Sequence, residues 1–341
     1  MRKPCVVLML NLCVATIAKQ QPPGAFSFTN DACVRQMVSE FNSNESPIKK
    51  WLYECWQFKL RTCTKGHPRT WCSFDGYPCL WSNMPPHKLL FIVSLAHALG
   101  VTHIVETGRK GAATTFAYDR LGFKVTSIEL TTIENVAQTL RALAPNVTLL
   151  EGDGNKLVPG AVSALSSSAA ATSAAVVPRV AVVIDGPKGP PALTLAQTIL
   201  NEVAFVAIDD VGGMAPSSLT SETVLSTHPN AFFTEDPRWY TPGDEVADTN
   251  FLRRFKGYAS CNTQHVTGKW AMEGWARQQV NMSHDATYYL GSQGAAIIPG
   301  GKWKEGKAKG GHHQSHCPSL ATIQSSFRPS MDGTLCDRVK R

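Results

Sequence analysis

Short apolar runs alternate with stretches of helical periodicity through the middle of this 341-residue chain, and no other feature constrains the fold as much. Apolar runs of this length, bounded by turn residues, are typical of buried strands. Strands that alternate with helices predict βαβ units and helices on both faces of a parallel sheet. The sequence therefore predicts an α/β fold with a doubly wound, mostly parallel sheet. The expected strands are residues 101–106, 124–130, 147–151, 180–184 and 203–208.

Two of the expected helices end at a glycine, Gly100 or Gly122, which is a common way to stop a helix. Residues 161–175 break the alternation, because they hold seven Ala and five Ser without an amphipathic period. An alanine-rich helix is one interpretation, but the serine run 166–168 and the missing period favour a low-complexity surface insertion, which we predict over about residues 160–178. The expected helices are residues 86–99, 111–121, 133–144 and 191–200.

The first 18 residues carry two cations, an apolar stretch and a small-residue cleavage site at residues 16–18. This pattern predicts a secretory signal peptide, with an uncleaved signal anchor or an organellar leader as the alternatives. Eight cysteines follow, five before residue 80 and three after residue 260. An even number on a secretory route predicts disulfides, whose pairing stays open. Sequons at Asn44, Asn146 and Asn281 favour the same secreted or lumenal location and predict a glycoprotein.

Composition divides the chain into four parts and excludes some partners. Lysine and arginine number 33 against 26 acidic residues, and no basic block stands out, so a nucleic-acid partner is not expected. After the leader, no apolar run reaches the ~18 residues needed to cross a bilayer. The parts are a signal peptide (1–18), a cysteine- and aromatic-rich N-terminal cap (19–87), the α/β domain (88–215) and an irregular C-terminal extension (216–341).

A carboxylate stands at or just after the end of every predicted strand. In an open parallel sheet, ligands bind at the carboxyl ends of the strands, where the strand order reverses. Gly108 and Gly111 form a turn after the first strand, and Glu129 stands 21 residues beyond Gly108. An acid at that spacing accepts hydrogen bonds from ribose hydroxyls. The strand-end carboxylates are Glu106, Glu129, Glu151, Asp153, Asp185, Asp209 and Asp210.

The same turn disfavours a nicotinamide dinucleotide. Lys110 stands where a dinucleotide-binding turn has its second glycine, and Glu106 adds negative charge beside the expected phosphate position. A cofactor with ribose, adenine and a cationic centre, but without phosphate, fits an acidic rim better. S-adenosyl-L-methionine has this chemistry, and we predict it as the cofactor.

Five segments, in order along the chain, resemble class I S-adenosylmethionine-dependent methyltransferases: HIVETGRKG, VTSIEL, LLEGDG, VVIDGPKG and VAIDDV. The resemblance covers under half of the chain and is nearest to the branch similar to catechol and caffeoyl-CoA O-methyltransferases. It implies a Rossmann-like fold in which Glu106, Gly108 and Gly111 surround the methionine part of the cofactor. It also implies that Glu129 holds the ribose hydroxyls and that Asp153 lies near the adenine.

Members of that branch use a divalent cation, and the resemblance assigns its ligands here to Asp185, Asp209 and Asp210. Carboxylate oxygens suit Mg²⁺ or a similar hard cation, which would lower the pKa of the hydroxyl to be methylated. The implied catalytic residues are Asp185 and Lys188, the latter as base or charge partner. The chain departs from the family in a first glycine turn one residue shorter, and in lacking Gly-Gly before the fifth strand.

The sequence thus predicts methyl transfer to an oxygen of a sugar, a glycan or a small molecule on the secretory route. A lumenal metal-dependent glycosyltransferase is one alternative. In that enzyme Asp209 and Asp210 would hold the metal of a nucleotide sugar, and Glu129 would have no role. The other alternative is a binding protein that keeps the fold without turnover.

Overall fold

A computed structural model of the chain describes residues 32–43, 46–49, 51–52, 73–74, 77–78, 84, 86–168, 178–211, 219–234, 294–303 and 317–326. The expected signal peptide lies outside these residues, as do two of the three sequons and six of the eight later cysteines. Expectations about those segments stay predictions. Within the described residues, no helix is long and apolar enough to cross a membrane.

One sheet of seven strands runs through the described part of the chain. Its members are β3 (His103–Thr107), β4 (Lys124–Glu129), β5 (Thr148–Glu151), β6 (Val180–Ile184), β7 (Phe205–Val211), β8 (Phe232–Phe233) and β9 (Gly294–Pro299). They lie in the order β5-β4-β3-β6-β7-β9-β8. The five strands predicted from the sequence pair in parallel, and β9 is antiparallel to both of its neighbours. The predicted fold class, α/β with a mostly parallel sheet, is confirmed.

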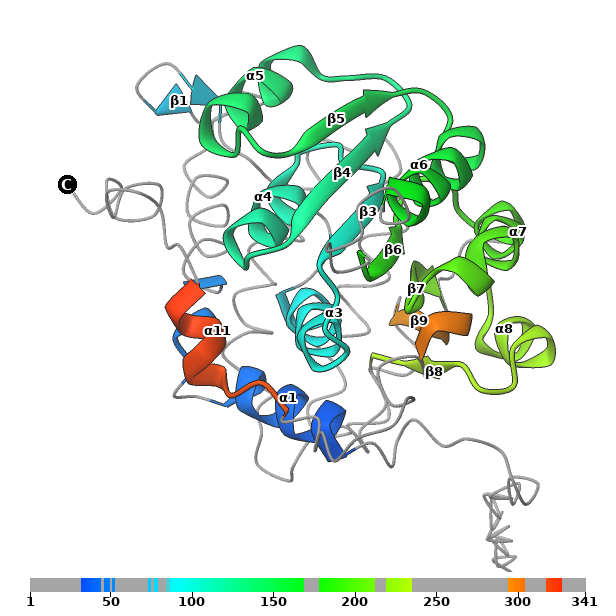
Figure 1. Cartoon of the computed structure of the whole chain (residues 1–341). Helices are drawn as coiled ribbons and strands as arrows, with labels where there is room; N and C mark the ends of the chain where they lie inside the picture. The colour runs from blue at the N-terminus through cyan, green and yellow to red at the C-terminus, as the bar shows by residue number, and fades with distance from the viewer. Residues whose placement is uncertain are drawn as a thin grey trace, which may run out of the picture.

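Helices cover both faces of this sheet (Figure 1). Side chains alternate between the faces along each strand, so Ile104 of β3 joins one buried cluster and Val105 joins the other. On the Ile104 face lie α1 (Ala32–Asn42), α3 (Pro86–Ala98) and α4 (Ala113–Arg120), with α5 (Glu134–Leu143) beside α4. On the Val105 face lie α6 (Gly154–Ser168), α7 (Pro190–Ile199) and α8 (Ser221–Thr227). Smaller elements are the hairpin of β1 (Ser73–Phe74) and β2 (Tyr77–Pro78), and two 3₁₀ turns, Leu200–Glu202 and Gly301–Trp303.

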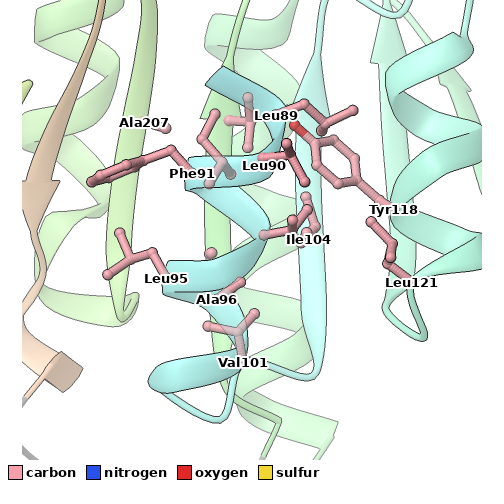
Figure 2. Packing of buried hydrophobic residues seen from close by; sticks show 14 of the residues in the cluster. Leu89, Leu90, Phe91, Leu95, Ala96, Val101, Ile104, Tyr118, Leu121 and Ala207 are labelled. Atoms are coloured by element: carbon pink, nitrogen blue, oxygen red, sulfur yellow. The ribbon is translucent and has the colours of Figure 1, made fainter. Parts of the chain in front are cut away.

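Helix α3 is buried over most of its length, from Lys88 to Ala96. Figure 2 shows Leu89, Leu90 and Phe91 packed among side chains of the sheet and of α4. A helix that is apolar all round is stable only between layers, and α1 packs against α3. Each fully buried leucine or phenylalanine stabilises the fold by roughly 1.5–3 kcal/mol. These contacts fix α3 firmly, and with it the lysine near its N-terminal end.

The predicted surface insertion is wrong for its first part. Helix α6 continues to Ser168, and Ala161 and Leu165 pack against the core. Small side chains give little amphipathic signal, which is why the sequence pattern hid this helix. Alanine is nevertheless the best helix former, and the buried Val162, together with Leu165, anchors the last turns in the core.

The predicted irregular extension after residue 215 is also wrong in part. Strand β9 pairs with β7 and β8, and its Ile297 and Ile298 are buried. The C-terminal part of the chain therefore completes the sheet. Pairing with β9 also carries β7 on to Val211, so Asp209 and Asp210 lie within the strand and not after it.

A disulfide joins Cys33, in the first turn of α1, to Cys317, shortly before α11 (Leu320–Ser326). Their Cα atoms are 5.3 Å apart. The backbone amide of Leu320 also donates to the Glu40 carboxylate of α1 at 3.2 Å. The expectation of disulfides is confirmed for this pair, which links one early cysteine to one late cysteine across the sequence.

Candidate functional site

The strand order reverses between β3 and β6, and the loops that follow these strands touch. The amide of Asp185 donates to the Thr107 carbonyl at 3.1 Å, and the amide of Gly186 donates to the Thr107 hydroxyl at 3.2 Å. Gly108 has φ 83°, and a Cβ there would lie 2.4 Å from the backbone nitrogen of Gly186. Open α/β sheets bind ligands at such a reversal. The sequence assigned Gly108 to ligand approach; in the structure it allows the two loops to meet.

The loop from Gly108 to Ala112 has an unusual backbone. Lys110 and Ala112 have φ values of 41° and 59°, in the region that costs a residue with a side chain about 1–2 kcal/mol. Gly111, the second glycine of the predicted turn, is not among the described residues with positive φ. Strained non-glycine residues cluster at functional sites, where surrounding contacts hold them.

Glu106 lies beneath the loop and is 1% exposed. The hydroxyls of Thr114 and Thr115, in the first turn of α4, donate to its carboxylate, and the Ser127 hydroxyl donates at 3.0 Å. Burial raises the pKa of Glu106, and these hydrogen bonds oppose the rise. The sequence placed Glu106 around the cofactor. The structure places it in the interior, where it fixes the start of α4.

Arg109, which the sequence analysis missed, ties the loop to β4. It is 3% exposed, and its guanidinium donates to the Ser127 carbonyl at 2.8 Å and to the Thr132 hydroxyl at 3.2 Å. The sequence gives no sign that Arg109 is buried, because a charged residue between two glycines is typical of an exposed turn. It interacts electrostatically with the carboxylates of Glu106, Glu129 and Glu151.

Glu129 ends β4 beside the same loop and is half-buried. Its carboxylate accepts hydrogen bonds from the Leu130 amide at 3.0 Å and from the Lys110 amide. A carboxylate has about four lone-pair sites, so these two neutral donors leave it able to accept more. The Leu130 side chain is 69% exposed and sets an apolar surface beside the carboxylate. Leu130 was not singled out from the sequence.

The end of β5 supplies two acids with local hydrogen bonds. Asp153 stands just before α6 and accepts from the Asn155 amide at 3.0 Å, as a helix-capping residue does. Glu151 accepts from the Thr132 amide at 3.0 Å, and the hydrogen bonds from Thr132 lower the pKa of Glu151. Glu151 pairs with Glu129 across the two strands. Both acids therefore lie at the edge that Glu129 occupies.

Asp185, Asp209 and Asp210 come together on the other side of the strand reversal, where the family resemblance implied a shared metal site. One oxygen from each lies within 4.8 Å of the others. Asp210 has φ 59° and stands where the pairing of β7 with β9 shifts register. A regular strand points consecutive side chains to opposite faces, and a bulge re-aims one of them. The bulge accounts for two consecutive aspartates reaching one cluster.

Two lysines pair with these three carboxylates. Lys88 of α3 lies 2.7 Å from Asp209, and the two side chains are 3% and 4% exposed. Lys188 contacts Asp185 and lies 2.8 Å from Asp210, and its side chain is 40% exposed. The sequence indicated Lys188 but missed Lys88. A lone lysine in an otherwise apolar helix was the available signal, because a buried lysine needs a partner.

The pairing decides which of these groups are charged. Burial raises the pKa of Asp185, and the charge of Asp209 raises it further. Burial also acts to raise the pKa of Asp209, but Lys88 and Lys188 hold it below its ordinary value. The pKa of Lys188 is raised, because the three carboxylates outweigh the cost of burial. Lys188 is therefore charged at neutral pH, and Asp185 takes up a proton more readily than Asp209.

The Tyr118 side chain runs from α4 toward Leu89, near the N-terminal end of α3 (Figure 2). Its hydroxyl is buried and has no hydrogen-bond partner among the described residues. Burial raises the pKa of this phenol, and so do the charges of Glu106, Asp185 and Asp209. Tyr118 therefore presents a neutral, unused hydroxyl within electrostatic reach of the carboxylate cluster.

No family model and no curated protein matches this chain. Among solved structures, the [4+2]-cyclase SpnF is similar over 72% of this chain and 92% of its own, with 13% identity and a TM-score of 0.36. A SAM-dependent methyltransferase from Thiobacillus denitrificans, in complex with S-adenosyl-L-homocysteine, is similar over 70% of this chain and 95% of its own, with 14% identity and a TM-score of 0.32. A SAM-dependent methyltransferase from Geobacter sulfurreducens, also in complex with S-adenosyl-L-homocysteine, is similar over 71% of this chain and 98% of its own, with 14% identity and a TM-score of 0.32. Because these TM-scores are low, the likenesses carry no argument about function.

Proposed function

We propose that this chain is an S-adenosylmethionine-dependent methyltransferase that methylates an oxygen. The observation that carries the proposal is the edge formed by Glu129 and Leu130. Glu129 offers unused carboxylate lone pairs to ribose hydroxyls, and Leu130 offers exposed apolar surface to a purine ring. Both lie at the carboxyl end of β4, beside the strained loop and the strand reversal.

The acceptor hydroxyl would bind on the other side of the reversal, at Asp185 and Lys188. As the acceptor oxygen forms its bond to the methyl carbon, the carbon–sulfur bond of the sulfonium breaks and the hydroxyl proton leaves. Asp185, whose pKa is raised by burial, is suited to accept that proton. While no cation occupies the cluster, Lys188 keeps its charge and would stabilise negative charge on the acceptor oxygen. Most of the rate would come from holding the two reactants in line.

We also propose that a divalent cation assists the methyl transfer. Asp185, Asp209 and Asp210 would hold it, since converging carboxylate oxygens are the donors that Mg²⁺ and similar hard cations prefer. When bound, it would supply positive charge that lowers the pKa of an acceptor hydroxyl. The acceptor we propose is a sugar, glycan or small-molecule hydroxyl on the secretory route. The bond between Cys33 and Cys317 supports an oxidising compartment.

Calorimetric titration of S-adenosyl-L-methionine into the full chain tests the proposal. We expect roughly micromolar affinity. Glu129→Ala should lose about 2 kcal/mol of it, or about 30-fold, as for a hydrogen bond to a charged group. Glu134→Ala is the matched control, because Glu134 is an exposed glutamate of α5 that pairs with Arg141 at the surface. It should leave the affinity unchanged.

Three other outcomes would contradict the proposal. Equal affinity in the wild type and Glu129→Ala would remove Glu129 from the cofactor site. Absence of binding in a folded protein, together with binding of a nucleotide sugar and Mn²⁺, would favour a glycosyltransferase. Binding of S-adenosyl-L-methionine without transfer to any hydroxyl tested would favour a protein that keeps the fold without turnover.

A further inference from the structure

The carboxylate cluster has two counter-ions that differ in their access to solvent. The Lys88 side chain is 3% exposed, and the Lys188 side chain is 40% exposed. Lys88 could leave Asp209 only by carrying its charge through the apolar surroundings of α3, which is costly. The Lys188 side chain reaches solvent, and its partners Asp185 and Asp210 are 20% and 34% exposed, so Lys188 can leave its carboxylates for water more easily than Lys88 can. Lys188 is therefore the counter-ion that can exchange.

The charge that remains without Lys188 matches one divalent cation. The carboxylates of Asp185, Asp209 and Asp210 together with the ammonium of Lys88 carry two net negative charges. Lys188 neutralises one of them. A hard divalent cation between the same oxygens would neutralise both, and carboxylate oxygens are its preferred ligands.

The Tyr118 hydroxyl independently indicates that a further group binds near the cluster. A buried hydroxyl without a partner costs about 1–3 kcal/mol. The hydroxyl of Tyr118 lacks a partner among the described residues, although the charges of Glu106, Asp185 and Asp209 all act on it. A hydration shell or acceptor oxygen brought in with a cation would give this hydroxyl a partner.

We propose that Lys188 is an exchangeable counter-ion that occupies the cation position between Asp185 and Asp210 and swings into solvent when a divalent cation binds. Lys88 stays on Asp209 throughout. This inference rests on the proposed function in one respect, namely that the acceptor hydroxyl binds beside the carboxylate cluster. Its consequence is that Lys188 competes with the cation, so removing Lys188 tightens cation binding.

Mn²⁺ alone is the probe, added to the full chain and followed by the electron paramagnetic resonance signal of the free ion. Lys188→Met should bind Mn²⁺ about tenfold more tightly than the wild type, which corresponds to about 1.4 kcal/mol. Lys188→Gln should show the same change and provides a second variant if one folds poorly. The matched control is Lys156→Met, which replaces an exposed lysine of α6. The affinity of this variant for Mn²⁺ should stay within about twofold of the wild type.

Equal or weaker Mn²⁺ binding by the Lys188 variants would overturn the inference, and so would a tightening that Lys156→Met reproduces. Asp210→Asn removes a ligand and should weaken Mn²⁺ binding both in the wild type and in the Lys188 variants. The two proposals fail separately, because the titration of S-adenosyl-L-methionine depends on Glu129 and the Mn²⁺ measurement depends on the cluster. Binding of S-adenosyl-L-methionine without any Mn²⁺ binding would overturn this inference and leave the proposed function standing.

Discussion

Helix α3 carries a basic side chain near each end, and the two differ in charge: Lys88 is charged and His97 is neutral. Near the carboxyl ends of the strands, Lys88 keeps its charge because Asp209 lies 2.7 Å away. At the other end, His97 packs beside the rings of Phe41 and Phe123, with centroids 5.7 and 4.5 Å away. Burial lowers the pKa of His97 to about 4, so the ring is neutral at pH 7.

This difference shows where the molecule retains charge at some cost. Burying a charged group is unfavourable unless it is paired, and the strand-end carboxylates beside β3, β6 and β7 come with lysine or hydroxyl partners. The base at the opposite end of α3 has instead lost its charge. The paired charge kept at the carboxyl ends of the strands is the physical reason for placing the functional site there.

The largest effect is expected for Lys88→Met. The substitution leaves the Asp209 carboxylate buried without its partner, which should lower the free energy of unfolding by about 3–5 kcal/mol. Urea unfolding followed by circular dichroism measures it. Lys188→Met removes a more exposed ion pair and should cost about 1 kcal/mol or less. Equal losses in the two variants would mean that the ion pairs of Lys88 and Lys188 contribute equally to stability, which would contradict the account.

Two glycines with positive φ, one at each end of β3, give the next comparison. Gly100 has φ 64° and no atom within 4 Å of an added Cβ, so Gly100→Ala should cost only the backbone strain, about 1–2 kcal/mol. At Gly108 the added Cβ would also meet the backbone of Gly186 at 2.4 Å. Gly108→Ala should therefore cost about 3 kcal/mol or more in urea unfolding. A loss no larger than that of Gly100→Ala would contradict the close contact of the two loops.

The pH dependence of stability tests the neutral state of His97. Its pKa in the folded chain, about 4, lies below its ordinary value of 6.5. The unfolded chain therefore binds the proton first as the pH falls. The stability due to neutral His97 is complete above pH 6.5 and is lost between about 6.5 and 4, up to about 3 kcal/mol.

The measurement compares the urea unfolding of the wild type and His97→Leu at pH 7 and pH 4.5. The wild type should lose about 2–3 kcal/mol more between the two conditions. Comparing two proteins cancels the other groups, including Asp185 and Glu106. Their raised pKa values act in the opposite direction and add stability as the pH falls. Parallel losses would mean that His97 is not held neutral.

The smallest effect is expected for Tyr118→Phe. The substitution keeps the ring and removes a buried hydroxyl that has no partner among the described residues, so the free energy of unfolding should rise by about 1 kcal/mol. Thermal unfolding without added ligand measures it. A clear loss of stability would mean that the hydroxyl is already satisfied, which would weaken the case that it awaits a group at the cluster.

The sequence predicted what depends on local pattern. The five parallel strands followed from their apolar runs, and the meeting of Asp185, Asp209 and Asp210 was implied by the resemblance to metal-dependent methyltransferases. Strand β9 was missed because its pairing with β7 joins residues far apart in the chain, and its short run AAIIP has no alternation. The end of α6 was missed because alanine and serine leave no apolar face to recognise.

Burial was the main property of the site that the sequence did not reveal. Spacing placed Glu106 and Glu129 in equivalent positions after two strands. In the structure three hydroxyls hold Glu106 inside, while Glu129 stays half-buried at the edge. Lys88 could not be matched with Asp209, 121 residues away, without the packing of α3 on the sheet. These are tertiary contacts, and single-residue spacing does not encode them.

The most direct test of the central claim is a double-mutant cycle between Glu129 and the ribose. Calorimetry would compare S-adenosyl-L-homocysteine with its 2′-deoxyribose analogue on the wild type and on Glu129→Ala. If Glu129 holds the ribose hydroxyls, the wild type should lose about tenfold or more in affinity for the deoxy analogue, and Glu129→Ala should lose almost nothing further. Equal losses in the two proteins, or no binding of either ligand, would contradict the account.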